Sequence, residues 1–109
     1  MVKRKQIEVV RNLKELLNGN GIRPDKIIIF GSQIRPGAAK DSDIDIIVLS
    51  EDFEGKGIFE RVKMSSGVHN KLVQKLFIPV DLMYYSLSEW KKGASLIIEA
   101  AKKEGVTFS

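Results

Sequence analysis

The chain has 109 residues, of which 43% are hydrophobic and 29% are charged, a size and composition typical of one soluble domain. It contains no cysteine, which excludes a disulfide framework and a thiolate zinc site. The net charge is +4, and the scattered placement of the basic residues favours a solvated surface over a nucleic-acid-binding patch. We expect residues 1–109 to form a single cytoplasmic domain with no signal peptide and no membrane span.

The first predicted element is a helix, because apolar residues recur at helical spacing and an Asn-Gly-Asn-Gly run at 18–21 ends the pattern. The apolar positions are Ile7, Val10, Leu13, Leu16 and Leu17. Three strands are then expected, each from a short apolar run rich in β-branched or aromatic residues. They span Lys26–Phe30, Ile44–Leu49 and Val80–Tyr85.

Helices are predicted between and after these strands. One turn of helix fits residues 34–39, and a longer helix fits 59–76, weakened by Ser-Ser-Gly at 65–67. The last helix begins at a capping box formed by Ser86 and Glu89 and ends at Gly105. The predicted order is therefore α-β-α-β-α-β-α, an α/β (α+β) fold with a mixed three-stranded sheet flanked by helices. The link between the first two strands is too short for a parallel crossover, so at least one strand pair is antiparallel.

A pair of carboxylates stands at the start of the second strand. Asp43 and Asp45 are two residues apart, so on a strand their side chains point to the same face. The first strand ends at Gly31-Ser32, and ten residues separate Ser32 from Asp43. Two adjacent anions are costly unless a positive charge lies between them, and a divalent cation shared with a polyphosphate is the natural partner. The pattern indicates a metal–nucleotide site.

Asp81 is the third candidate ligand, because it is the charged residue of an otherwise apolar third strand. If that strand lies beside the second, Asp81 joins Asp43 and Asp45 around Mg²⁺, and two such ions can promote in-line nucleotidyl transfer. The alternative is that Asp81 is a solvated edge residue and Asp43 caps a turn. Gly31 and the Ser32 hydroxyl can contact phosphate oxygens, although the spacing matches neither a Walker loop nor a dinucleotide fingerprint.

These motifs resemble the nucleotidyltransferase superfamily that includes DNA polymerase β, and within it the minimal nucleotidyltransferase (MNT) domain. The resemblance implies that Asp43 and Asp45 bind two Mg²⁺ ions and that Asp81 binds the catalytic ion and helps to deprotonate the acceptor. It also implies that Gly31, Ser32 and Arg35 hold the triphosphate of an NTP, with ATP as the expected donor. Pro36 and Gln33 depart from the usual family run around that loop.

The same resemblance suggests a role. Minimal domains of this kind often act as the antitoxin of a helical HEPN partner, and some transfer AMP to a tyrosine of that partner. The alternative is a non-catalytic module that masks the partner by complex formation. Nucleic acid is not indicated as a ligand, and a homo-oligomer remains open. We expect His69 to be a surface residue, because the chain has no second histidine with which to share a metal.

Overall fold

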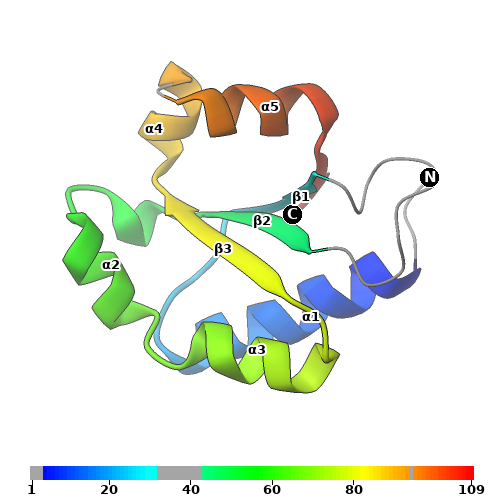
Figure 1. Ribbon diagram of the computed structural model, residues 1–109. Helices are drawn as coiled ribbons and strands as arrows, with labels where there is room; N and C mark the ends of the chain where they lie inside the picture. Colours follow the sequence, from blue (N-terminus) through cyan, green and yellow to red (C-terminus); the bar gives the residue numbers. More distant parts are fainter. Residues whose placement is uncertain (1–3, 32–42, 94) are drawn as a thin grey trace.

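The computed structural model describes residues 4–31, 43–93 and 95–109 (Figure 1). The three predicted strands form at the expected residues. The elements in chain order are α1 (Arg4–Gly19), β1 (Lys26–Phe30), β2 (Ile44–Leu49), the 3-10 helix η1 (Glu51–Phe53), α2 (Ile58–Met64), α3 (Val68–Leu76), β3 (Val80–Tyr85), α4 (Leu87–Lys92), α5 (Leu96–Glu104) and β4 (Val106–Phe108). The helical turn predicted at 34–39 lies outside the described residues.

The strands form one mixed sheet in the order β3-β2-β1-β4. β1 is antiparallel to both of its neighbours, and β2 is parallel to β3. The mixed sheet and the α+β class are therefore confirmed, but the sheet has four strands where three were predicted. The fourth strand has only three residues, too few to show a periodicity. It forms because Ile27–Ile29, on the open edge of β1, offer backbone partners to Val106–Phe108.

Helices cover both faces of the sheet, so the domain has three layers (Figure 1). α1 and α3 pack on the face that carries Ile27, Ile29 and Ile46. α4 and α5 cover the opposite face, where Ile28 and Ile47 contact Ala101. Both central strands are buried on both faces, because their side chains alternate between two apolar layers.

α1 holds to the sheet through side chains one turn apart. Val9, Leu13 and Leu17 are fully buried, and burying each such side chain contributes roughly 1.5–3 kcal/mol. Ile7, predicted on the apolar face, is instead exposed near the start of the helix.

Two predicted helices are each divided in two. The helix expected over 59–76 breaks into α2 and α3 at Gly67, whose φ of 83° is left-handed, and Ser65 donates its hydroxyl to the carbonyl of Arg61 there. The helix expected from Ser86 to Gly105 breaks at Gly93, with φ of 62°, and Ser95 caps the new start. The predicted capping box of Ser86 and Glu89 is present. Left-handed glycines end helices readily, because they carry no Cβ.

In the part of the chain that the structure describes, no helix combines the length and the apolar character needed to cross a bilayer.

Candidate functional site

Two of the three predicted acids meet where β2 and β3 begin. The parallel register places Asp45 directly opposite Asp81, as it places Ile44 opposite Val80. Both carboxylates project from the face covered by α4 and α5. Alternate residues of a strand point to the same face, and Ile47 and Met83, two positions after Asp45 and Asp81, pack there. Asp43 precedes β2 and is exposed.

Burial, followed by repulsion from Asp81, raises the pKa of Asp45 above its ordinary value. A side-chain hydrogen bond with Asp81 and the charge of Asp43 raise this pKa further. On its other side Asp45 pairs with Phe30 of β1, a buried ring that keeps water from one flank of the carboxylate. The charged form of Asp45 is thus disfavoured by its own surroundings, and a cation between the facing carboxylates would reverse that effect.

Gly31 closes this end of the sheet. Its φ of 86° is left-handed, and a Cβ built on it would collide with the carboxylate of Asp45. Glycine is therefore required here by both backbone conformation and space. Ser32 and Arg35, the other residues predicted to contact phosphate, lie outside the described residues.

An open cleft of about 620 Å³ contains the two facing acids. Its lining residues are Phe30, Asp45, His69, Asp81, Leu82, Met83 and Ile97. The volume falls within the roughly 300–1,000 Å³ range of small-molecule sites. Carboxylates at one end and apolar walls beside them suit a ligand with a polyanionic part and a less polar part.

His69 is exposed, as predicted, but the sequence did not reveal its position beside the acids. Its Nε2 donates to the carbonyl oxygen of Val80 over 2.6 Å, directly before Asp81. The same ring lines the cleft of Asp45 and Asp81. The contact joins α3 to β3 across eleven residues, and no sequence motif marks such a pair.

The facing carboxylates fit a divalent cation that shares its ligands with phosphate. Within residues 4–31, 43–93 and 95–109, no three His, Cys, Asp or Glu side chains are grouped closely enough to hold an ion alone. The pKa of Asp45 nevertheless responds to both Asp81 and Asp43, so the three charges are near one another. Two facing carboxylates are sufficient for such a site, because Mg²⁺ commonly uses only one or two carboxylates and takes its other ligands from water and phosphate.

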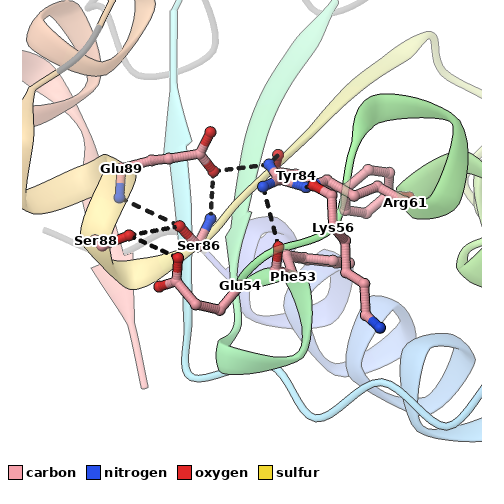
Figure 2. A network of polar contacts seen from close by, with 8 residues as sticks. All are labelled: Phe53, Glu54, Lys56, Arg61, Tyr84, Ser86, Ser88 and Glu89. Carbon is pink, nitrogen blue, oxygen red and sulfur yellow. Dashed lines mark hydrogen bonds and ion pairs between the residues drawn. The ribbon is translucent and has the colours of Figure 1, made fainter.

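The far end of β3 is fixed by a polar network around Arg61 (Figure 2). The guanidinium donates to the carbonyl oxygens of Lys56, Phe53 and Tyr84 at 2.9, 3.0 and 2.9 Å. It also forms an ion pair of 2.7 Å with Glu89. Burial acts to raise the pKa of Glu89, but hydrogen bonds from Ser86 and Arg61 and the charge of Arg61 outweigh it and lower the pKa. The network joins α2, η1 and α4 to β3, and so holds the strand that carries Asp81.

Comparisons with known proteins identify the family and the fold of this chain. The family model described as "Polymerase beta, Nucleotidyltransferase" matches residues 11–106. The fold is similar to a crystal structure from Sulfolobus solfataricus described as a candidate nucleotidyltransferase, with a TM-score of 0.58 and 22% identity. That match covers 94% of this chain and 81% of the other, and at this identity it shows the fold alone. No curated protein gave a significant match.

Proposed function

This chain belongs to the polymerase β nucleotidyltransferase family, and on that premise we propose that it transfers a nucleoside monophosphate from an NTP to an acceptor hydroxyl. The observation that carries the proposal is the pair Asp45 and Asp81, which face each other across parallel strands in an open cleft. The raised pKa of Asp45 supports it, because perturbed acids in clefts are characteristic of reactive sites.

The residue roles are those that the family resemblance implies. Asp43 and Asp45 would hold two Mg²⁺ ions, Asp81 would hold the catalytic one, and Gly31, Ser32 and Arg35 would hold the triphosphate of ATP. Bound magnesium supplies positive charge to phosphate oxygens. Asp81 accepts the proton of the acceptor hydroxyl while the hydroxyl oxygen of the acceptor forms a bond to the α-phosphorus. The bond from that phosphorus to the β-phosphate oxygen breaks, and pyrophosphate leaves.

The acceptor in this proposal is a hydroxyl of a helical HEPN-type protein, and the chain acts as its antitoxin by adenylylating it. The observation on this chain that favours a protein acceptor is its cleft, which opens at the edge strand β3 and so is accessible to a large molecule.

The test uses ATP labelled at the α-phosphate, Mg²⁺, the purified chain and a purified HEPN-type helical protein as the candidate acceptor. We expect label on the partner from α-labelled but not γ-labelled ATP. Asp81→Asn should reduce the rate roughly a hundredfold or more, and Asp45→Asn should do the same. Glu15→Gln, an exposed acid on α1, is the control and should retain activity.

A stable complex that carries no label under these conditions would contradict the transferase proposal. It would instead favour the alternative, in which this chain inactivates its partner by covering it. Equal labelling by wild-type and Asp81→Asn protein would show that the acid pair is not the reactive site.

A further inference from the structure

Three apolar side chains of α2 are uncovered, while Met64 is partly buried against the core. None of the seven residues of this helix is buried, and Ile58, Phe59 and Val62 are 74%, 87% and 62% exposed. Figure 1 places α2 beside the edge strand β3, at one end of the molecule. So short a helix has little stability of its own, and a group of three exposed large apolar residues on it is typical of an interaction surface rather than of a solvated helix.

This apolar surface is continuous with the acid cleft. Ile58 and Val62 line a hollow together with Leu82 and Met83 of β3. Val62 and Leu82 line a second hollow that reaches His69. His69 in turn lines the cleft of Asp45 and Asp81. A molecule lying on α2 would therefore extend along β3 to the reacting groups.

A second exposed ring lies at the other end of this path. Phe77 is 89% exposed and has a φ of 57°, and it is the one non-glycine residue with positive φ among the described residues. It lines a hollow with His69 and Asp81. A bulky residue in the left-handed region is rare, since glycine or asparagine usually occupies this position after a helix. The strained backbone thus holds an aromatic ring in solvent beside the site.

Side chains limit the backbone of β3 that a partner could reach. The outward carbonyl of Val80 accepts from His69, and that of Tyr84 accepts from Arg61. Added strands need a row of available backbone groups, and side chains that cover an edge prevent such pairing. The occupant of this surface is therefore bound through its side chains and not as an extra strand.

The segment that contains α2 and α3 has a net positive charge, although Lys56 forms an exposed ion pair of 3.7 Å with Glu60. Residues 56–76 contain five Lys or Arg and one acid, Glu60, which is a net charge of +4 and equals that of the whole chain. The remaining 13 basic and 13 acidic residues cancel. Lys56 lines the hollow beside Ile58, and Lys63 stands one helical turn after Phe59. A partner with acidic residues around apolar anchors is complementary to this surface.

We propose that Ile58, Phe59, Val62, Lys56 and Lys63, which we call the α2 face, dock an acidic protein that presents apolar side chains. The binding claim stands on exposure and charge alone. The claim that the docked protein is the acceptor rests on the proposed function. Protein is favoured over nucleic acid because aliphatic side chains form much of the surface and because Arg61, the one arginine of α2, is used internally.

The test measures binding by fluorescence anisotropy in EDTA and without nucleotide, so that catalysis plays no part. The labelled probes are a random copolymer of glutamate and tyrosine, polyglutamate, and single-stranded RNA of equal charge. We expect the copolymer to bind at least about fivefold more tightly than polyglutamate or RNA. Equal binding of all three, or tighter binding of RNA, would overturn the proposal.

Matched variants locate the binding surface. Phe59→Ser should weaken copolymer binding roughly fivefold or more, and Ile58→Asn provides a second variant. Leu96→Ser is the control, because Leu96 is 88% exposed on α5. The double variant Lys56→Glu/Lys63→Glu should weaken copolymer binding more than the double variant Lys91→Glu/Lys92→Glu. Both double variants change the net charge by the same amount. If the α2 variants and their matched controls lose the same copolymer affinity, the α2 face is not the docking site.

Asp81→Asn separates this inference from the proposed function. We expect this variant to bind the copolymer as the wild type does, while losing transfer. Specific binding in a chain that transfers nothing would leave the docking claim standing and remove the acceptor claim. If Phe59→Ser and Ile58→Asn weaken copolymer binding but leave transfer to the partner unaffected, the acceptor claim is removed, while docking and transfer both stand.

Discussion

Replacing Asp45 by Asn should stabilise the metal-free protein. Neighbouring strands lie about 4.8 Å apart, and Asp45 faces Asp81 directly in the register. Two unit charges at that distance repel by about 3.5 kcal/mol at an effective dielectric constant of 20, and by about 0.9 kcal/mol in water. Because Asp81 is exposed and Asp45 half-buried, screening places the repulsion near the lower value. We expect a gain of about 1 kcal/mol in the free energy of unfolding at pH 7.5.

The gain should depend on pH in a defined direction. The pKa of Asp45 is raised in the folded protein by burial and then by Asp81, above an unfolded value of about 3.9. The folded state therefore binds this proton more tightly than the unfolded state. Above the raised pKa, the ionised carboxylate of Asp45 lowers the free energy of unfolding. As the pH falls through that pKa towards about 4, this destabilisation and the advantage of Asp45→Asn should disappear.

Urea denaturation in EDTA at pH 7.5 and pH 4, followed by circular dichroism, measures both effects. Glu15→Gln is the control, because it removes one exposed acid away from the pair and should gain nothing. Adding Mg²⁺ at pH 7.5 should stabilise the wild type, since an ion that binds the folded state adds its binding free energy. A metal-free Asp45→Asn variant that is less stable than wild type at pH 7.5 would refute the reasoning, as would a gain that is the same at both pH values.

Two further changes test the surroundings of the site. Gly31→Ala should cost about 1–3 kcal/mol of unfolding free energy, because φ is positive and the new Cβ meets the Asp45 carboxylate. The control Gly57→Ala, at a position with open space and a φ of −75°, should cost less than about 0.5 kcal/mol. Equal costs for the two variants in urea denaturation would contradict this prediction. Glu89→Gln should lower the melting temperature at pH 7 through its weakened contact with Arg61. The pKa of Glu89 is lowered in the folded protein. The stability that its charge contributes is therefore present above about pH 4.3 and is lost as the pH falls further. A lower melting temperature of Glu89→Gln that persists at pH 2 would contradict this role of the charge.

The sequence determined the parts of this protein that depend on local pattern. The three longer strands form at the residues where apolar runs predict them, and the capping box starts a helix at Ser86 as expected. These features need only neighbouring residues, because strand and helix periodicity and cap chemistry act within one or two turns. The spacing of Gly31, Asp45 and Asp81 likewise pointed to the family before any fold was known. Even the concentration of charge in residues 56–76 can be read from the chain, although its meaning cannot.

The tertiary structure decided what depends on distant partners. Asp45 faces Asp81 because packing against both helical layers sets the register of β2 and β3, and a slip by one residue would turn one carboxylate to the other face. β4 forms only because β1 has an open edge to pair with. The place of His69 beside the acids and the exposure of α2 arise in the same way. Contacts between residues far apart in the chain determine them, and no local pattern in the sequence specifies such contacts.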